Sequence, residues 1–237
     1  MTTEPEFLEN YDAKAFDRPS VAVDVALVTV VNGLLNVLVL QRNEHPYQGR
    51  WQLPGGFVRP SESLDEAAGR VLRDKVGIED VFTEQLYTFG RVDRDPRTRV
   101  ISVAYYALVE TDRLHTAGDA VRLAQIQVPW AGETEGSVTL TADGDDLEVA
   151  FDHDRIAGMV VNRLRGKLNY APVGYQLLPP EFTLLDLQRI HETILGRRVN
   201  KDSFRRRMLA SGELEPTGRR QTEVGHRPAL LYRARKR

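Results

Sequence analysis

The residues best suited to chemistry lie between Gly55 and Ile78, where acidic side chains recur along a stretch with a helical pattern. Glu62, Glu66 and Asp74 supply carboxylates there. Carboxylates three or four residues apart on a helix share one face. Such a face can hold Mg²⁺, which offsets phosphate charge and orients an attacking water molecule. The three carboxylates therefore make this stretch a candidate site for binding a metal ion and phosphate.

The same stretch carries the signals of a loop that opens onto a helix. Gly55 and Gly56 predict a turn, Ser61 is suited to cap the helix that follows, and Gly77 ends it. Apolar residues recur at helical spacing and predict a buried stripe. These residues are Leu64, Ala67, Ala68, Val71 and Leu72.

This pattern resembles the Nudix box: G, five residues, E, seven residues, R-E-U, one residue, E-E, one residue, G-U, where U is bulky and apolar. Six positions fall in register, namely Gly56, Glu62, Arg70, Leu72, Gly77 and Ile78. The resemblance implies an α/β/α sandwich with a mixed sheet. It also implies hydrolysis of a diphosphate linked to another group, with divalent cations held by the box glutamates.

Three box positions depart from the pattern, and they are the ones that carry the metal chemistry. Val71, Asp74 and Lys75 stand where the metal-binding glutamates belong. Valine offers no ligand atom, and Lys75 places a positive charge where a cation would bind. We therefore expect a Nudix scaffold that keeps its shape, with no catalytic residue and no metal site. The alternative is an ADP-ribose pyrophosphatase that uses Glu62, Glu66, Asp74 and carboxylates from other loops.

Arginines near the box are candidates for binding a diphosphate, because guanidinium groups bind phosphate in a bidentate manner. Arg94-Asp95-Pro96-Arg97 resembles the ADP-ribose-recognising branch of the Nudix family. The alternative, slightly less favoured, is that Asp95-Pro96 shapes a turn and the arginines are solvated. Arg70 has a second interpretation as a brace of the box helix. The candidate effector-binding residues are Arg42, Gly55, Gly56, Arg59, Arg70, Arg91, Arg94 and Arg97.

Composition limits the class of protein. The chain has 237 residues and no cysteine, which excludes a disulfide framework and thiolate chemistry. The N-terminus is acidic, and no apolar run reaches the roughly 18 residues of a membrane span. We expect a cytoplasmic protein with no membrane partner and no required cofactor.

Charge is unevenly distributed along the chain. Residues 179–237 contain 14 Lys and Arg against 7 Asp and Glu, a net charge of +7, while residues 1–178 carry −9. A basic C-terminal part joined to an acidic body suggests nucleic acid as a partner. A solvated charged surface is the alternative.

The pattern of residues before the basic C-terminal part predicts mainly strands joined by turns. Residues 21–31 predict a buried strand, Asn32-Gly33 a hairpin turn, and residues 34–40 the returning strand. Further strands are predicted at residues 84–89, 100–110, 120–128 and, as a hairpin, 138–151. A helix is predicted at 155–168, with Asp152-His153-Asp154 as its cap. A metal site at His153 is the less favoured alternative.

The basic C-terminal part has the order of a winged helix. Thr183 and Gly196 bound one predicted helix, and Asn200 caps a second at 201–209. Strands are predicted at 213–217 and 229–233, with a basic loop between them. Two short helices joined by a glycine-containing turn fit a helix-turn-helix. A small basic protein-binding domain is the alternative.

The second helix is the candidate for reading DNA. Phe204 and Met208 are predicted to face inward, with Ser203, Arg206 and Arg207 on the opposite side and Arg205 nearer the edge. Arg206 and Ser203 are expected in a major groove, and the other basic residues on phosphates. The candidate DNA-binding residues are Asn200, Lys201, Ser203, Arg205, Arg206, Arg207, Arg219 and Arg220.

Taken together, these parts resemble NrtR-type proteins, the Nudix-related transcriptional regulators of NAD metabolism. The resemblance includes 182–184, 194–196, 204–206 and the segment from His226 to Tyr232-Arg233. It implies a homodimer that represses NAD biosynthesis or salvage genes at a palindromic operator in double-stranded DNA. ADP-ribose or a related NAD-derived dinucleotide would release the DNA. A non-catalytic module with protein contacts through its tail is a third possibility.

The expected fold is α+β, and four segments are predicted. They are an N-terminal arm at 1–18, a Nudix-like effector-binding domain at 19–154, a linking helix and connection at 155–178, and a winged-helix DNA-binding domain at 179–237.

Overall fold

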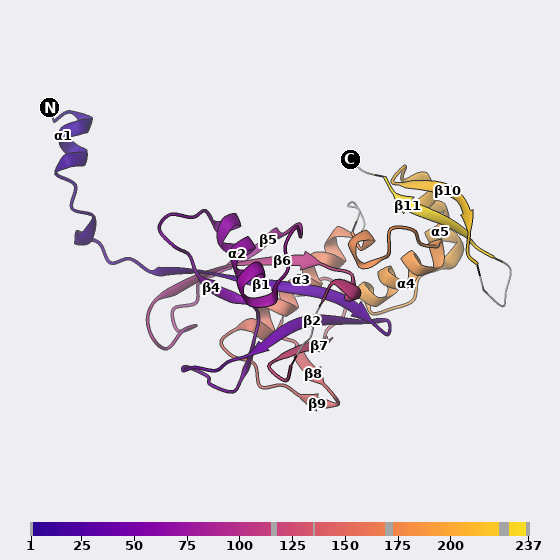
Figure 1. The fold of residues 1–237 in the computed structure, drawn as a ribbon, viewed down its shortest axis with the longest axis horizontal. Helices are drawn as coiled ribbons and strands as arrows, with labels where there is room; N and C mark the ends of the chain where they lie inside the picture. The colour runs from indigo at the N-terminus through magenta and orange to yellow at the C-terminus, as the bar shows by residue number, and fades with distance from the viewer. Residues whose placement is uncertain (1, 115–117, 135, 169–172, 223–227, 236–237) are drawn as a thin grey trace.

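The chain forms a mixed β-sheet covered by a helix on each face, with a smaller C-terminal domain beside it (Figure 1). The computed structural model describes residues 2–114, 118–134, 136–168, 173–222 and 228–235. The N-terminal arm contains the helix α1 (Glu4–Glu9) and the 3₁₀ turn η1 (Ala13–Ala15), and it extends away from the body. The α/β/α sandwich predicted from the sequence is confirmed.

The long strand β1 (Ser20–Val31) is central to the sheet. It pairs antiparallel with β2 (Leu34–Gln41) across the predicted Asn32-Gly33 turn, and parallel with β6 (Val100–Leu108). Both turn residues have positive φ, of 51° and 76°, as a two-residue hairpin of this kind requires. The apolar run of β1 follows from burial on both faces, since each face is covered by a helix.

The remaining strands extend the sheet to either side. The order is β5-β6-β1-β2-β7-β8-β9, with β3 beside β2 and β4 beside β1. Their bounds are β3 (Trp51–Gln52), β4 (Gly55–Phe57), β5 (Glu84–Phe89), β7 (Val121–Gln127), β8 (Thr139–Ala142) and β9 (Asp145–Asp146). A 3₁₀ turn, η2 (Thr111–Arg113), follows β6.

The helix α2 (Leu64–Val76) covers one face of the sheet. Ala67, Ala68, Val71 and Leu72 are buried against residues of β1 and β6, so most of the predicted stripe is confirmed. The cap prediction was wrong by two residues. Ser63 caps the helix, because Ser63 and Glu66 have the spacing of a capping box and exchange hydrogen bonds with each other's backbone.

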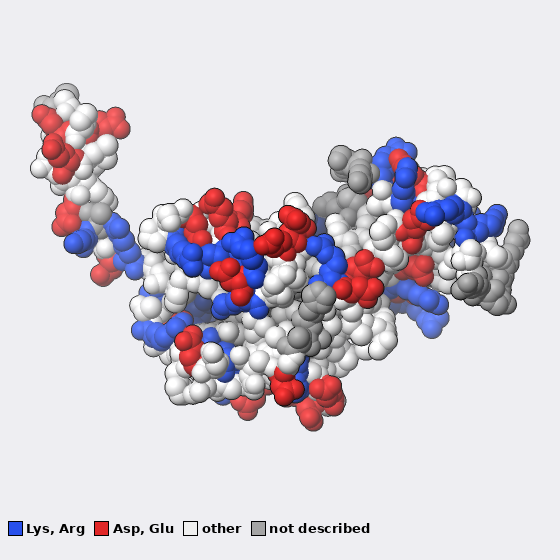
Figure 2. All heavy atoms as spheres, viewed as in Figure 1, with Lys and Arg blue, Asp and Glu red and all other residues white. Residues whose placement is uncertain are grey.

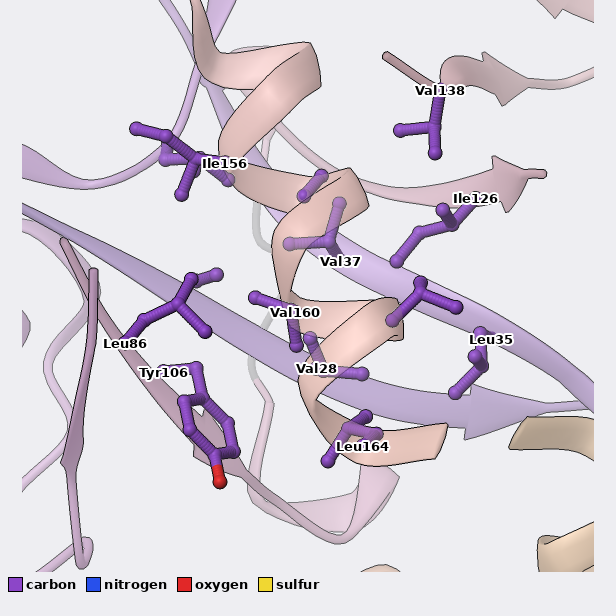
Figure 3. Packing of buried hydrophobic residues seen from close by; sticks show 14 of the residues in the cluster. Val28, Leu35, Val37, Leu86, Tyr106, Ile126, Val138, Ile156, Val160 and Leu164 are labelled. Atoms are coloured by element: carbon purple, nitrogen blue, oxygen red, sulfur yellow. The ribbon is translucent and has the colours of Figure 1, made fainter. Parts of the chain in front are cut away.

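The helix α3 (His153–Lys167) covers the opposite face. Ile156, Val160 and Leu164 lie along the side of the helix that faces the sheet, and they pack against Val28 of β1 and Val37 of β2 (Figure 3). This cluster is the main hydrophobic core. The predicted helix therefore exists, but it begins two residues earlier than expected.

The C-terminal domain has the order of a winged helix. After a 3₁₀ turn, η3 (Tyr175–Leu177), come α4 (Leu184–Leu195), α5 (Lys201–Ala210), β10 (Leu214–Arg220) and β11 (Leu230–Ala234). Phe182 joins the small sheet through two backbone hydrogen bonds with Tyr232. The caps at Thr183 and Asn200 and the left-handed Gly196 match the sequence prediction. The predicted connection at 169–172 and the segment 223–227 lie outside the described residues.

The two domains share part of one core. Ile190 and Ile194 of α4 belong to the same buried cluster as Leu164 and Leu168. Arg165 of α3 is buried and donates hydrogen bonds to the carbonyl oxygens of Ile194 (2.9 Å), Trp130 (3.3 Å) and Gly132 (2.9 Å). The helix predicted as a link therefore serves both as a layer of the sandwich and as the support of α4.

None of the helices in the described residues is both long enough and apolar enough to cross a membrane.

Gly158 offers a test of the packing of α3. A Cβ atom at this position would overlap the carbonyl oxygen of Gly136, so we expect Gly158→Ala to lower the free energy of unfolding by about 1–3 kcal/mol. Gly69→Ala in α2 is the matched control. Among the described residues, no atom beyond the neighbouring residues and backbone of the same helix lies within 4 Å of its added Cβ, and alanine is expected to raise the free energy of unfolding by about 0.5–1 kcal/mol. Urea denaturation measures both, and equal effects would contradict the packing.

Candidate anion-binding pocket and nucleic-acid interface

A hollow of about 250 Å³ gathers charged side chains at one end of the sheet. Residues of β1, β4, the end of α2, the loop before β6 and the start of α3 contribute to it. The lining residues that carry charge are Asp24, Arg42, Glu44, Lys75, Arg94, Asp95 and Arg97. Five predicted effector-binding residues lie here, namely Arg42, Gly55, Gly56, Arg94 and Arg97.

Asp24 is the buried carboxylate at the base of this pocket. It lies within the otherwise apolar β1 and pairs in register with Gly55 of β4. A Cβ atom on Gly55 would overlap Oδ1 of Asp24, so the glycine leaves room for the carboxylate. Ser102 of β6 donates a hydrogen bond of 2.5 Å to Oδ2 of Asp24. Gly55, in the glycine turn of the box, thus allows the buried carboxylate of Asp24 to pack against the backbone.

Arg94 is buried between two carboxylates and is 4% exposed. Its guanidinium donates to both oxygens of Asp152, at 3.1 and 2.6 Å, and lies 3.4 Å from Oδ2 of Asp24. Burial alone would lower the pKa of Arg94, but the hydrogen bonds to Asp152 and the charges of Asp24 and Asp152 outweigh it and raise the pKa. Arg94 therefore stays charged in the wall of the pocket.

Asp152 and His153 have roles other than the predicted capping. The Asp152 side chain makes no capping hydrogen bond and instead holds Arg94. His153 accepts a hydrogen bond of 2.8 Å from the backbone N–H of Leu53 at Nδ1, and its Nε2 lies 3.5 Å from Asp24. Burial lowers the pKa of His153, with Asp24 acting in the opposite direction, so the ring is neutral. Asp152 does occupy the predicted N-cap position and Asp154 the first turn, but the Asp152 carboxylate pairs with Arg94 and does not cap the backbone.

Arg42 and Arg97 form the aromatic side of the pocket. Arg42 donates to the backbone of Pro46 (2.7 Å) and to the side chain of Gln52, and its guanidinium lies 5.0 Å from the centre of the Phe151 ring. Arg97 forms a bidentate pair with Asp95 and lies 5.5 Å from the centre of the Phe57 ring. Planar guanidinium groups stacked on rings still present N–H groups at their edges. Such edges suit a phosphate group.

Arg59, Arg70 and Arg91 lie outside the pocket. Arg70 donates to both oxygens of Glu62, at 2.8 and 2.6 Å, and to the carbonyl oxygen of Phe57. It braces the loop before α2, the second of its two predicted roles. The backbone N–H of Arg59 donates to Glu62, and Arg91 makes an exposed pair with Asp93 at 2.7 Å. The structure does not bring these three residues to the pocket that holds the other candidate arginines.

The box carboxylates do not converge on a metal position. Glu62 is held by Arg70, Glu66 by the backbone of Ser63, and Asp74 lies 3.6 Å from Arg73 in an exposed pair. Val71 is buried in the core under α2. Within the described parts of the chain, no group of three or more His, Asp or Glu side chains is arranged to hold a metal ion.

A second and larger hollow, of about 1070 Å³, separates the two domains on one side. It is an open groove between the start of β2, the end of β7, α4 and the start of α5. Asn200, Ser203 and Arg207 lie on its wall. We give more weight to the smaller pocket, because there buried charges from separate elements converge.

The helix α5 presents basic residues to solvent. Phe204 and Met208 are buried as predicted, and Ser203, Arg205 and Arg206 are exposed. Arg207 is not on the far side of the helix. At 100° per residue it lies next to Phe204, and its guanidinium lies 5.7 Å from the centre of that ring. Arg207 is itself exposed, and burial, followed by the charge of Arg207, lowers the pKa of His191 to about 4.

The remaining predicted contacts lie at the start of α5 and on the wing. Asn200 caps α5 by accepting from the backbone N–H of Ser203, and Lys201 is exposed beside it. Arg219 and Arg220 end the strand β10 and do not lie in a loop, because the strand extends to residue 220. Arg219 pairs with Glu181, and Arg220 donates to the carbonyl oxygen of Pro228. Figure 2 shows Lys and Arg side chains over this domain.

Comparison with known proteins agrees with this division into two domains. Residues 19–141 match the NUDIX domain family, and residues 174–234 match the family described as NrtR DNA-binding winged helix domain. The fold and its sites therefore define a Nudix domain joined to a DNA-binding winged helix.

Whole-chain similarity identifies the family more closely. The chain is 36% identical, over 98% of its length, to the ADPR responsive transcriptional repressor NtrR of Acinetobacter baylyi, and covers 89% of it. It also resembles the crystal structure of Shewanella oneidensis NrtR complexed with a 27mer DNA (34% identity, 91% of this chain, 93% of that chain, TM-score 0.76). The NUDIX domain of the same protein, complexed with ADP ribose, matches at 32% identity over 68% of this chain and 99% of that chain (TM-score 0.50). This chain belongs to the NrtR family.

Several pocket residues were not predicted from the sequence. Ser102, Asp152 and His153 join the site through contacts with residues far along the chain. The sequence could have predicted a role for Asp24, because a charged residue inside an apolar strand needs a buried partner. Lys75 was noted only as a departure from the box.

The buried ion pair predicts a large effect of removing Arg94. Arg94→Met would leave Asp24 and Asp152 buried without their shared cation, so we expect the free energy of unfolding to fall by about 3–5 kcal/mol. Arg50→Met is the matched control, since Arg50 makes an exposed pair with Glu148, and its loss should cost about 0–1 kcal/mol. Urea denaturation compares them. Similar losses in both variants would contradict the role of Arg94.

The brace at Glu62 predicts a pH dependence. Hydrogen bonds from Arg70 lower the pKa of Glu62 to about 2. A carboxylate with a lowered folded-state pKa stabilises the protein fully above its unfolded pKa of about 4.3, and loses this contribution as pH falls toward the folded value. The difference in unfolding free energy between the wild type and Glu62→Gln should therefore shrink as pH falls from about 4.5 toward 2. Asp74→Asn is the control, and a difference that grows on acidification would refute the brace.

Proposed function

We propose that this protein is a DNA-binding transcriptional repressor whose Nudix domain binds ADP-ribose, or a related NAD-derived dinucleotide, and then releases DNA. The observation that carries the proposal is the similarity, over 98% of the chain, to a protein named as an ADPR responsive transcriptional repressor. The related NrtR structures, one with DNA and one with ADP ribose, support the same two ligands.

The chemistry of the pocket supports a diphosphate ligand. Arg42, Lys75 and Arg97 bring positive charge to a hollow of about 250 Å³, below the range of about 300–1,000 Å³ typical of a whole small-molecule site. The hollow suits the charged centre of a dinucleotide, with the base and sugars lying over its rim. The exposed Phe57 and the half-buried Phe151 offer rings beside it.

We infer that the domain does not hydrolyse its ligand. Metal-assisted cleavage of a diphosphate needs several carboxylates on one side of the ligand. Val71 is buried, Asp74 lies in an exposed pair, and Lys75 is a cation, so these residues do not fit a divalent metal. No cofactor is required for such a binding domain. The ligand would survive, which suits a protein that reports its concentration.

On DNA, we propose a homodimer that binds a palindromic operator in the cytoplasm and represses genes of NAD biosynthesis or salvage. Each α5 would enter a major groove, with Arg206 and Ser203 toward the bases and Asn200, Lys201 and Arg205 toward phosphates. Arg219 and Arg220 of the wing would add phosphate contacts. Arg207, which leans onto Phe204, would stay at the margin of this interface.

The route from ligand to DNA is proposed to run along α3. Its first residue, His153, lines the pocket, the preceding Asp152 holds the pocket residue Arg94, and Arg165 near its end holds α4. At 1.5 Å per residue, these 15 residues span about 22 Å. A ligand can release DNA only if it binds better to a dimer whose recognition helices are wrongly spaced for the operator.

The decisive experiment uses the full chain and a DNA duplex selected by the protein from a random-sequence pool. Fluorescence anisotropy should detect specific binding that weakens as ADP-ribose is added, and the same sample should contain no AMP. Release without AMP supports the proposal. Sustained AMP formation would instead favour an ADP-ribose pyrophosphatase, and unchanged DNA binding would remove ADP-ribose as the effector.

Arg206 tests the proposed recognition helix. We expect Arg206→Ala to weaken binding to the selected duplex by about 1–3 kcal/mol and to leave ADP-ribose affinity unchanged. Arg73→Ala, in α2, is the control for removal of an exposed arginine. Phosphate contacts should also make DNA affinity fall steeply with salt. Wild-type affinity in the Arg206 variant would remove α5 from its assigned role.

A further inference from the structure

Lys75 occupies a position in the pocket that the Nudix pattern reserves for a carboxylate. It lies in the last turn of α2, and its side chain lines the hollow together with Arg42, Asp24 and Glu44. The side chain reaches solvent, yet enough protein surrounds the ammonium group for desolvation to lower its pKa. Asp24 raises that pKa and Arg42 lowers it, which places the ammonium among the other pocket charges.

The four cations of the pocket differ in how many of their N–H groups already have a hydrogen-bond or ion-pair partner in the protein. Arg94 is held by two buried carboxylates, and Arg97 by Asp95. Arg42 donates to backbone and amide oxygens. Lys75 has three N–H donors, and among the described residues no hydrogen bond or ion pair occupies them. The ammonium is therefore the cation best placed to accept a new anionic partner.

Three carboxylates line the pocket, of which Asp24 and Asp95 are engaged by other residues, whereas Glu44 acts on Lys75 by raising its pKa. Asp24 is bound by Ser102 and lies beside Arg94 and His153, and Asp95 is bound by Arg97. A divalent cation entering the pocket would meet the ammonium of Lys75 and the guanidinium of Arg42. A dinucleotide diphosphate, which carries two negative charges, would meet two cations that no carboxylate neutralises within 4 Å in the described structure.

We propose that Lys75 is a built-in counter-charge that binds the diphosphate of the effector directly, in place of the divalent metal. The inference rests on the proposed function, since it concerns the same pocket and ligand. It goes further in assigning a binding role to a residue of the altered box. The altered residue thus supplies the positive charge that the scaffold would otherwise take from a metal ion.

Calorimetric titration of the full chain with ADP-ribose, in EDTA and in Mg²⁺, tests this assignment. The wild-type dissociation constant should differ by less than about threefold between the two buffers. Lys75→Met, which keeps the length and removes the charge, should weaken binding by about ten- to hundredfold in both buffers. Lys75→Arg should retain most of the affinity. Arg73→Met, on the same helix but outside the pocket, should bind as the wild type does.

Urea denaturation of each variant shows whether the domain that contains Lys75 is folded, and binding to the selected DNA duplex shows that α5, in the other domain, is unaffected. Wild-type affinity for ADP-ribose in Lys75→Met, or wild-type binding that requires Mg²⁺, would overturn the inference and leave the proposed effector in place. No binding of ADP-ribose by the wild type in either buffer would overturn both.

Discussion

The structure depends on one buried charge arrangement, in which Arg94 lies between Asp24 and Asp152. Charges removed from water need partners with good geometry, and breaking such a set leaves an uncompensated charge. The three residues come from β1, the loop before β6 and the start of α3, so their contact fixes these elements relative to one another. Gly55 gives Asp24 its space, and His153 completes the wall as a neutral ring. The pocket is the open side of this arrangement.

Local patterns predicted most of the fold, whereas the site needed contacts that no local pattern contains. Strand periodicity, the Asn32-Gly33 turn and the Asn200 cap each act within a few residues, and each was predicted. Arg94 pairs with carboxylates 58 and 70 residues away, which spacing does not show. Arg70, only 8 residues from Glu62, had its bracing role foreseen as an alternative.

Two features would let the protein respond to ligand concentration. The altered box would bind the ligand, and the shared core would connect the two domains. In the proposal for Lys75, a fixed counter-charge would make affinity depend on the ligand alone, and not also on the concentration of free metal. The response must then reach the other domain. The helix α3 contacts both places, with Asp152 at one end and Arg165 at the other. Because Ile194 is packed into the main core, a shift of α3 cannot occur without an effect on α4.

The placement of the two tryptophans has a practical consequence. Trp51 precedes the glycine turn, with the guanidinium of Arg122 at 5.1 Å from its ring. Trp130 lies at the domain junction, where Arg165 stacks on it at 5.0 Å and its buried indole N–H lacks a partner within the described structure. Indole emission depends on local polarity and charge. With Trp51→Phe the native fluorescence would report the domain junction, and with Trp130→Phe it would report β3, next to the pocket residue Gln52, so the molecule contains separate optical probes for the two regions that the proposed path connects.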